Sequence, residues 1–304
     1  MDRFDINILG CGSALPTAKH ALSCQVVNLR DKLYMIDCGE GAQLQFRKMK
    51  LNFSRLNHIF ISHLHGDHCF GLPGLLSTLG LLGRTGELVI HAHPDAEKIF
   101  QPQLDFFCNK MSYQVRFNHI NPSKHCLIYE DRTVRVYSIP LKHRIPTCGF
   151  LFEELPKSPH IIRDMIDFHQ VPVSRINAIK AGSDFINQEG VTIPNSVFTR
   201  PAKPPKRYAY CSDTAYQEKV ADIIQGVDLL YHEATFSQQD IVRAKETYHS
   251  SAQQAASIAL QAQVGKLMIG HFSARYPKEH VLLQEAQAIF PNTIAADEFM
   301  TVSI

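Results

Sequence analysis

The 304-residue sequence predicts a mixed α/β fold, in which two βα-rich halves pack as a four-layer αββα sandwich with a protruding, flexible arm. Three observations lead to this prediction. Short apolar runs of β type alternate with helical patterns along most of the chain. Several of these runs end directly in His or Asp, as a single site on one rim of a sheet requires. The alternation stops over residues 153–207, so we expect one domain formed by residues 1–152 and 208–304.

The first half can be assigned in order. The run Ile6–Gly10 is predicted to be a strand, and the Gly/Pro turn after it is a weaker match to a phosphate-binding loop than to a simple strand end. Asp95 is predicted to cap a helix. The predicted strands cover residues 6–10, 24–29, 33–36, 58–61, 87–93, 133–140 and 150–152, and the predicted helices cover 42–49, 70–79 and 95–107.

The second half repeats this alternation. Ser251 and Gln254 have the spacing of a capping box, which opens an Ala-rich helix. The predicted strands cover residues 208–211, 227–231, 266–269 and 299–304, and the predicted helices cover 217–225, 252–263 and 277–289.

The predicted arm, residues 153–207, has weak periodicity and many prolines. A long insertion of this kind is either a functional excursion or a disordered linker. Its last eight residues hold four basic side chains, which would attract phosphates without regard to sequence. These are Arg200, Lys203, Lys206 and Arg207.

Composition limits the classes of function. A hydrophobic fraction of 45% and a charged fraction of 20% are ordinary for a globular protein. The chain has no run of about 18 apolar residues and no signal-peptide pattern, so we expect no membrane association. Eight scattered cysteines without a C-x-x-C pair indicate a reducing, cytoplasmic location. The net charge of +2 is too small to indicate nucleic-acid binding by itself.

The strongest functional signal is the run His63-Leu64-His65-Gly66-Asp67-His68, directly after an apolar β-type run. Imidazole and carboxylate side chains together suit borderline divalent ions such as zinc. On a corner between a strand and a loop, residues i, i+2, i+4 and i+5 can converge on one point, whereas a helix needs i, i+3 or i+4 spacing. The motif therefore predicts a metal site.

Further His and Asp residues follow other predicted strands: Asp37, His143, Asp213, His232 and His271. His63, His65, Asp67, His68, His143, Asp213 and His271 give seven candidate ligands. This number suffices for two metal ions if Asp213 bridges them, and two adjacent ions suit displacement at phosphorus. His91 and His93 alternate like strand residues, and we expect them to pack or to lie at the surface rather than to bind metal.

These blocks resemble the metallo-β-lactamase superfamily, and more specifically the short bacterial form of ribonuclease Z, the tRNA 3′-processing endonuclease. The superfamily resemblance rests on the H-x-H-x-D-H block with Asp37, His143, Asp213 and His271. The family resemblance rests on Asp37–Gln43, Ser212–Thr214, His232–Thr235, His249–Ala252 and Gly270–Tyr276, and it covers nearly the whole length.

The resemblance implies two zinc ions per subunit. His63, His65 and His143 would hold one ion, Asp67, His68 and His271 the other, and Asp213 would bridge them. Asp37 and His232 would support the ligands from behind. Glu233 and His249 would relay a proton to the 3′ leaving oxygen, while zinc-bound hydroxide oriented by Asp67 attacks the phosphodiester. The products would be a tRNA with a 3′-hydroxyl and a trailer with a 5′-phosphate.

The resemblance also implies a homodimer in which each arm grips the precursor tRNA bound at the partner's site. Two departures from the family pattern concern substrate recognition. The arm has Val171–Ser174 and Ile179–Gly182 where a Gly-Pro pair and a Leu-Lys-x-Gly are usual. The loop after Leu15-Pro16-Thr17 continues Ala18-Lys19-His20 where Arg-Asn is usual.

Two rival functions stay open. The same scaffold could carry a phosphodiesterase or arylsulfatase for small esters, although a small substrate needs no basic arm. Alternatively, the chain could be a non-catalytic RNA-binding or metal-binding relative, but every ligand position is filled.

Overall fold

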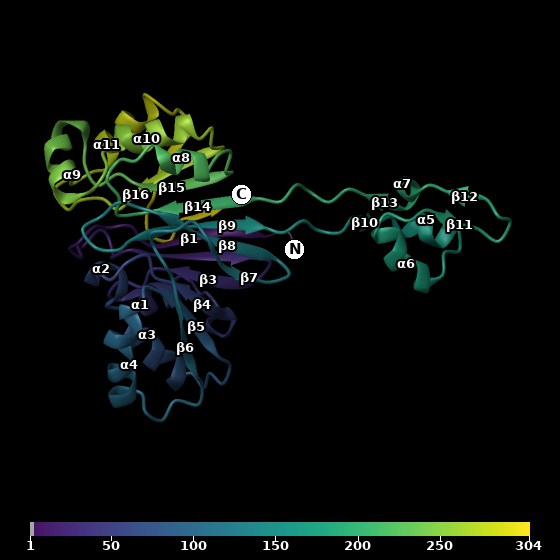
Figure 1. Cartoon of the computed structure of the whole chain (residues 1–304), viewed down its shortest axis with the longest axis horizontal. Helices are drawn as coiled ribbons and strands as arrows, with labels where there is room; N and C mark the ends of the chain where they lie inside the picture. The colour runs from purple at the N-terminus through teal and green to yellow at the C-terminus, as the bar shows by residue number, and fades with distance from the viewer. Residues whose placement is uncertain (1–2) are drawn as a thin grey trace. The chain divides into compact units, whose positions relative to one another are not determined.

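The computed structural model describes residues 3–304 (Figure 1). The chain divides into two compact units. The main unit runs up to Glu153 and resumes over Lys206–Ile304, and the inserted unit is Glu154–Pro205. We predicted Lys206 and Arg207 to lie in the arm, but they belong to the main unit. Arg207 begins a strand there and pairs with Glu153.

The first sheet of the main unit has seven strands in the order β18-β1-β2-β3-β4-β5-β6. Their bounds are β18 Thr301–Ser303, β1 Phe4–Gly10, β2 Cys24–Leu29, β3 Lys32–Ile36, β4 Leu56–Phe60, β5 Leu88–Ala92 and β6 Val115–His119. The strands from β3 to β6 run parallel. Their carboxyl ends therefore meet at one edge of the sheet.

The second sheet also has seven strands, in the order β17-β16-β15-β14-β9-β8-β7. Their bounds are β17 Thr293–Ala295, β16 Lys266–Gly270, β15 Leu229–Glu233, β14 Arg207–Cys211, β9 Cys148–Glu154, β8 Val134–Pro140 and β7 Leu127–Glu130. The neighbours β14, β15, β16 and β17 are parallel, so their carboxyl ends also share an edge.

Two layers of helices cover the outer faces of the sheets, which confirms the predicted αββα sandwich (Figure 1). One layer contains α1 Ala42–Lys48, α3 Leu72–Leu81 and α4 Asp95–Phe107, and the other contains α8 Lys219–Ile223, α10 Ala252–Gln261 and α11 His280–Gln287. The single-turn helix α2 Gly66–Cys69 and helix α9 Ile241–Thr247 complete the set. Ser251 forms the predicted capping box, whereas Asp95 is the first residue of α4 and Pro94 precedes it as the N-cap.

The predicted division of the sandwich at the insertion is wrong. Strands β7, β8 and β9 precede the insertion but belong to the second sheet, and β18 at the end of the chain belongs to the first. The cause is antiparallel pairing, because β9 pairs with β14 across the insertion and Val302 pairs with Ile6. The sequence order of apolar runs does not record such long-range pairing.

Apolar side chains from both sheets form the core between them. Ile6, Ile8 and Phe60 of the first sheet are completely buried in one cluster with Phe150 and Phe152 of the second. A separate cluster lies between the first sheet and its helices. This double packing fixes the two sets of strand ends against each other and so positions the site.

The inserted unit is folded and has a small core of its own. It contains α5 Arg163–Phe168, α6 Val173–Lys180 and α7 Asn195–Phe198. It also has two pairs of antiparallel strands: β10 His160–Ile161 with β13 Thr199–Arg200, and the hairpin of β11 Phe185–Ile186 with β12 Thr192–Ile193. Its buried side chains are Ile166, Val171, Ile179 and Phe198. The disordered-linker alternative therefore does not apply. Within residues 3–304, no helix is long and apolar enough to cross a membrane.

Candidate metal centre

The residues of the candidate site lie just beyond strand ends in both sheets. Asp37 follows β3, His63 follows β4, Asp213 follows β14 and His271 follows β16. Asp37, Asp213 and His271 have φ angles of 57°, 59° and 58°, which lie in the left-handed region. This conformation is uncommon for residues other than glycine and turns the chain sharply at the rim of the sheet. Asp67 and His68 lie on helix α2, so the motif includes one helical turn rather than only a loop.

Four ligand atoms form the first group: His63 Nε2, His65 Nδ1, His143 Nε2 and Asp213 Oδ2. His65 Nδ1 lies 2.9 Å from His63 Nε2 and 3.2 Å from His143 Nε2. Asp213 Oδ2 lies 3.7 Å from His63 Nε2 and 3.6 Å from His143 Nε2. The four side chains are close enough to hold a single ion.

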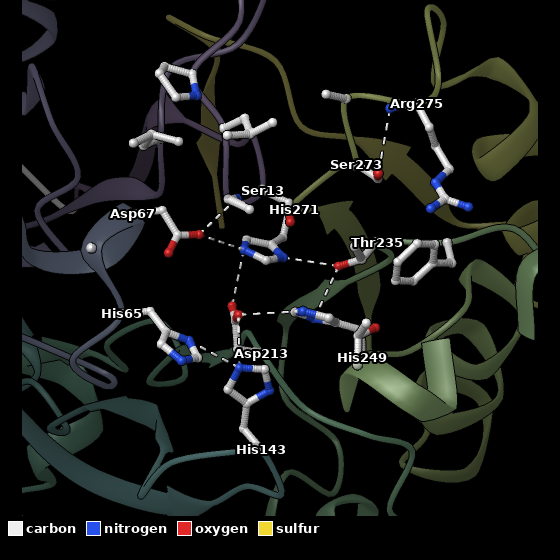
Figure 2. A pocket seen from close by; sticks show the side chains of 18 of the residues that line it. Ser13, His65, Asp67, His143, Asp213, Thr235, His249, His271, Ser273 and Arg275 are labelled. Carbon is white, nitrogen blue, oxygen red and sulfur yellow. Dashed lines mark hydrogen bonds and ion pairs between the residues drawn. The ribbon is translucent and has the colours of Figure 1, made fainter. Parts of the chain in front are cut away.

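The second group shares the same aspartate. Asp213 Oδ1 lies 3.0 Å from His68 Nε2 and 3.1 Å from His271 Nε2. Asp67 Oδ2 lies 3.5 Å from His68 Nε2 and 3.6 Å from His271 Nε2. Figure 2 shows Asp213 at the centre, between the His65–His143 side and the His271 side. Each oxygen of Asp213 therefore serves one group.

The geometry fits divalent metal ions. The Nε2 atoms of His68 and His271 are buried without a hydrogen-bond partner, although carboxylate oxygens lie nearby. Ligands that surround a zinc ion tetrahedrally at 2.0–2.1 Å are separated by roughly 3.3 Å. Within each group, the distances given above between ligand atoms range from 2.9 to 3.7 Å. The orphaned nitrogens and the spacing both match a metal centre.

Four of the histidines offer Nε2 as the ligand atom. In each of them, the other ring nitrogen, Nδ1, contacts a polar group of the protein. His68 Nδ1 donates to Asp37 Oδ2 at 2.7 Å, and His143 Nδ1 donates to the Tyr248 carbonyl at 3.0 Å. His63 Nδ1 lies 3.0 Å from Ser62 Oγ, and His271 Nδ1 lies 3.0 Å from Thr235 Oγ1. These contacts fix the tautomer in which Nε2 carries the free lone pair, as metal-binding histidines require.

The electrostatics of the first group agree with this assignment. Burial lowers the pKa of His63, and burial likewise lowers the pKa values of His65 and His143, so these rings stay neutral. Burial alone raises the pKa of Asp213, but His271 and His68 outweigh it and hold that pKa well below its usual range. The carboxylate thus stays ionised in a closed environment, which favours a bound cation. At His68 of the second group, burial alone lowers the pKa, but Asp213 and Asp37 outweigh it and raise that pKa well above its usual range, so the carboxylates draw positive charge to this ring.

Asp37 accepts from the candidate ligand His68, and we propose that it orients that ring. Asp37 is completely buried and accepts from the Ser62 amide at 2.7 Å, from Ser62 Oγ at 2.9 Å and from the Tyr210 hydroxyl at 2.7 Å. His232 does not share this role. Its Nδ1 lies 2.7 Å from the Glu233 carbonyl, and no hydrogen bond among the described residues joins its ring to a ligand. Side chains alternate along a strand, so His232 and Glu233 of β15 face opposite sides.

Glu233 and His249 form a pair beside the metal groups. His249 Nδ1 donates to Glu233 Oε1 at 2.9 Å. Glu233 is completely buried and also accepts from the Thr214 amide at 2.6 Å and the Ser250 amide at 3.2 Å. Burial alone lowers the pKa of His249, but Glu233 outweighs it and raises the pKa to about 9. His249 therefore carries a proton at neutral pH.

A cavity of about 640 Å³ opens onto these groups. Its lining includes ligands from both groups together with three arginines and several apolar side chains. The arginines are Arg144, Arg243 and Arg275, and the apolar side chains include Leu15, Leu22, Phe70 and Phe236. Figure 2 shows Ser273 and Arg275 on one side of the cavity and Asp67 on the other. Cationic and apolar walls around a metal centre suit a phosphate ester with an organic group.

The structure brings the seven candidate ligands together in space, but several residues that contact them were not among the predicted site residues. Ser62, Tyr210, Thr235 and Tyr248 contact Asp37 or ligand histidines. Ser62 is adjacent to His63, so a search for polar neighbours would have found it. Tyr248 contributes only its backbone carbonyl, for which the sequence carries no signal. His91, as predicted, packs: it is buried and stacks on Phe60.

The chain resembles curated proteins over its full length. It is 62% identical to a ribonuclease Z of Parabacteroides distasonis, with 100% of both chains covered. It is 59% identical to a ribonuclease Z of Bacteroides fragilis strain YCH46 and 56% identical to one of Porphyromonas gingivalis strain ATCC 33277, again over 100% of each chain. Residues 4–104 also match a family model described as anti-Pycsar protein Apyc1.

Solved structures show the same architecture. The short form of human tRNase Z aligns with a TM-score of 0.71 at 24% identity, covering 99% of each chain. The metallo-β-lactamase fold protein YhfI of Bacillus subtilis aligns with a TM-score of 0.71 at 17% identity, covering 100% of each chain. These likenesses show that the fold is that of the metallo-β-lactamases. Because the curated relatives combine high identity with complete coverage, the chain belongs to the ribonuclease Z family.

Proposed function

We propose that this chain is a zinc-dependent endoribonuclease that removes the 3′ trailer from precursor tRNA. One observation carries the chemistry: the two oxygens of Asp213 face two separate ligand groups, and His249 Nε2 lies 4.0 Å from the same carboxylate. This arrangement places a charge-stabilising centre and a proton donor beside each other. The family membership supports tRNA as the substrate.

The donor set fits zinc, which binds imidazole and carboxylate groups tetrahedrally. In this proposal His63, His65 and His143 would hold one ion, Asp67, His68 and His271 would hold the second, and Asp213 would belong to both groups. When bound, the pair of ions supplies an activated nucleophile and stabilises negative charge at phosphorus.

Asp67 positions the attacking water. Its Oδ2 accepts from the Ala14 amide at 2.9 Å and faces His68 and His271, and its carboxylate lies at the cavity wall. Burial alone raises the pKa of Asp67, but His68 and His271 outweigh it and lower that pKa, so the group is ionised. An ionised carboxylate can accept a hydrogen bond from the water and direct its lone pair at the phosphorus.

His249 donates a proton to the leaving group. The attacking water gives up one proton to solvent as its oxygen bonds to phosphorus, while the bond from phosphorus to the 3′ oxygen breaks. The 3′ oxygen takes the proton from His249 Nε2, which leaves a 3′-hydroxyl on the tRNA and a 5′-phosphate on the trailer. Glu233 is too buried to reach the substrate; it orients His249 and keeps it charged.

The inserted unit is proposed to bind the tRNA backbone. Its cationic side chains are exposed and can attract phosphates: Arg163, Arg175, Lys180, Arg200 and Lys203. Lys206 instead pairs with Asp228 in the main unit at 2.7 Å, so it is removed from this surface. The resemblance further suggests a cytoplasmic homodimer in which each inserted unit serves the partner's site.

A second candidate function is hydrolysis of small phosphate diesters. The cavity of about 640 Å³ is large enough for a nucleotide, and a structure described as unliganded yeast PDE1 shares the fold, with a TM-score of 0.60 at 12% identity over 100% of each chain. The separate inserted unit with exposed cations favours RNA over this alternative.

The deciding experiment is incubation of zinc-loaded protein with a 3′-extended precursor tRNA, followed by mapping of the cut and of both new ends. Cleavage near the 3′ end of the acceptor stem with a 3′-hydroxyl and a 5′-phosphate supports the proposal. Hydrolysis of bis(p-nitrophenyl) phosphate with no cleavage of the precursor would favour the small-diester function.

A further inference from the structure

A buried charged cluster lies beside the metal centre and outside its ligand groups. His20 is 6% exposed, and both of its ring nitrogens contact carboxylates. Nδ1 lies 2.8 Å from Glu298 Oε2, and Nε2 lies 2.8 Å from Glu279 Oε1. Since both partners are acceptors, both ring nitrogens must donate, and the ring is an imidazolium.

Charge balance around His20 agrees with this protonation state. The titratable groups that contact its ring are Cys11, Glu279 and Glu298, and Lys19 pairs with Glu279. Burial alone lowers the pKa of His20, but the hydrogen bonds that its ring donates to Glu298 and Glu279 outweigh burial and raise that pKa. A neutral ring would leave one buried carboxylate without a charged partner, which is costly.

His20 stands at the base of the loop Gly12–Ala21. The loop closes on itself, because the Gly12 amide donates to the Ala21 carbonyl at 2.9 Å and the Thr17 amide donates to the His20 carbonyl at 3.0 Å. The chain is tightly packed at this closure, since a Cβ at Gly12 would lie 3.0 Å from His20 Cβ and would force a shift of a few tenths of an ångström. Glu298 also accepts from the Ala21 amide at 2.9 Å, so the carboxylate grips both the ring and the backbone.

The other end of this loop reaches the metal centre. Ala14, with a φ angle of 55°, donates its amide to Asp67 Oδ2 at 2.9 Å. The Ser13 amide donates to the Phe272 carbonyl at 3.0 Å, directly after the ligand His271. Figure 2 shows Ser13 close to both Asp67 and His271. The loop thus connects the His20 cluster with the carboxylate proposed to direct the attacking water.

We propose that His20, clamped between Glu279 and Glu298, is a positioning residue that holds the Ala14 amide on Asp67 and so sets the orientation of this ligand. The inference rests on the proposed function, because it takes Asp67 as a metal ligand and catalytic group. It assigns a task to the loop at which the sequence departs from the family pattern. His20 acts through the loop and does not touch the substrate.

A rival interpretation is a third metal site. Cys11 Sγ lies 3.4 Å from His20 Nδ1 and 3.7 Å from Glu298 Oε1, so these three side chains could hold an ion. The separation of 2.8 Å between His20 Nδ1 and Glu298 Oε2 is that of a direct hydrogen bond, which favours the clamp. Metal analysis separates the two interpretations.

The test compares His20→Gln, which removes the charge, with His20→Arg, which keeps it and can bond both carboxylates. Glu279→Gln removes the charge of the more exposed of the two carboxylates. This variant replaces the His20 variants in the test if they do not fold. His119→Gln is the matched control, because His119 forms an exposed pair with Glu97 at 2.6 Å. Metal-depleted protein is titrated with Co²⁺, whose visible absorption reports ligand geometry, and hydrolysis of bis(p-nitrophenyl) phosphate gives kcat and KM.

We expect His20→Gln to change the Co²⁺ spectrum of one of two bound ions and to lower kcat about tenfold with KM nearly unchanged, as for residues that orient metal ligands. His20→Arg should restore much of both, and His119→Gln should match the wild type. A His20→Gln protein with wild-type spectrum and kcat would overturn the clamp. The clamp would also be overturned if the wild-type chain bound three ions and the His20→Gln variant bound one fewer. Failure of the wild type on precursor tRNA would count only against the proposed substrate, since neither readout uses tRNA.

Discussion

The Nδ1 atom of His249 donates to Oε1 of Glu233 at 2.9 Å, and this contact leaves Nε2 as the nitrogen that faces the metal ligands. Glu233 itself is enclosed by backbone amides of Thr214 and Ser250. The carboxylate cannot rotate away or reach solvent, so the ring it holds is preorganised in orientation and charge.

Glu233→Gln is expected to lower kcat for precursor cleavage about 100-fold at pH 7. The amide cannot hold the charge of His249, so the pKa of His249 should fall from about 9 and less of the proton donor is present. The loss of kcat should therefore shrink as the pH is lowered and grow as the pH is raised. A kcat profile between pH 5 and pH 9 checks this.

The control is Glu130→Gln, since Glu130 forms an exposed pair with Arg135 at 3.0 Å. It should reproduce the wild-type profile. A Glu233→Gln profile parallel to the wild type at every pH would contradict the assigned role of Glu233.

Asp67→Ala should abolish cleavage, by at least about 100-fold, while tRNA binding survives. The substitution removes a ligand atom of the second group and the acceptor of the Ala14 amide, but it leaves the inserted unit untouched. Single-turnover cleavage and filter binding of the same labelled precursor measure the two effects. Asp95→Ala, at an exposed aspartate paired with Lys98, is the control. Unchanged turnover in Asp67→Ala would refute the mechanism.

Acid should destabilise the fold through His91. His91 Nδ1 accepts from Asn118 at 2.9 Å, so Nε2 carries the proton and donates to His58 Nδ1 at 3.1 Å. Burial lowers the pKa of His91 to about 3 and that of His58 to about 4, against about 6.5 in an unfolded chain. This contribution to stability is complete above pH 6.5 and is lost as the pH falls toward these folded values.

The His91→Asn variant isolates that contribution. Between pH 7 and pH 5, the free energy of unfolding of the wild type should fall by about 2 kcal/mol more than that of the variant. Urea titrations at the two pH values measure the difference, and the metal centre cancels because both proteins contain it. Equal losses in the two proteins would show that His91 is not held neutral.

The ligands could be predicted from sequence because each follows a β-type run or lies in one short motif, and parallel strands bring their ends together. The residues that hydrogen-bond to the ligands or to Asp37 could not be predicted in this way. Tyr210 and Asp37 are 173 positions apart, and only the packing of the two sheets joins them. The same packing explains why β8 and β9 were assigned to the wrong half.

The folded core of the inserted unit was not predicted, for a related reason. Its core residues, among them Ile166, Ile179 and Phe198, come from separate short helices, so no window of sequence shows a helical or alternating period. Strand β6 and helix α9 were also missed, because β6 is only half-buried and α9 has few buried residues. Elements that are stabilised by tertiary contacts leave weak local patterns.

Deletion of Ser158–Pro204 should remove precursor-tRNA processing and spare hydrolysis of small diesters. The two cut ends can be joined, because β9 and β14 pair directly, with Glu153 opposite Arg207. The deletion leaves the ligand groups, His249 and Glu233 in the main unit. Parallel assays with precursor tRNA and bis(p-nitrophenyl) phosphate measure the two activities, and a thermal melt confirms the fold.

A second test of the inserted unit removes only two of its positive charges. Arg200→Ala with Lys203→Ala should weaken tRNA binding and reduce the slope of log K against log salt by about 1 to 2, since each phosphate contact contributes about 0.7 to 0.9. Lys206→Ala is the matched control from the same basic run, because Lys206 pairs with Asp228 at 2.7 Å and should leave that slope unchanged. If the control changed binding as much as the double variant, the cations that grip the RNA would have to be sought on the main unit.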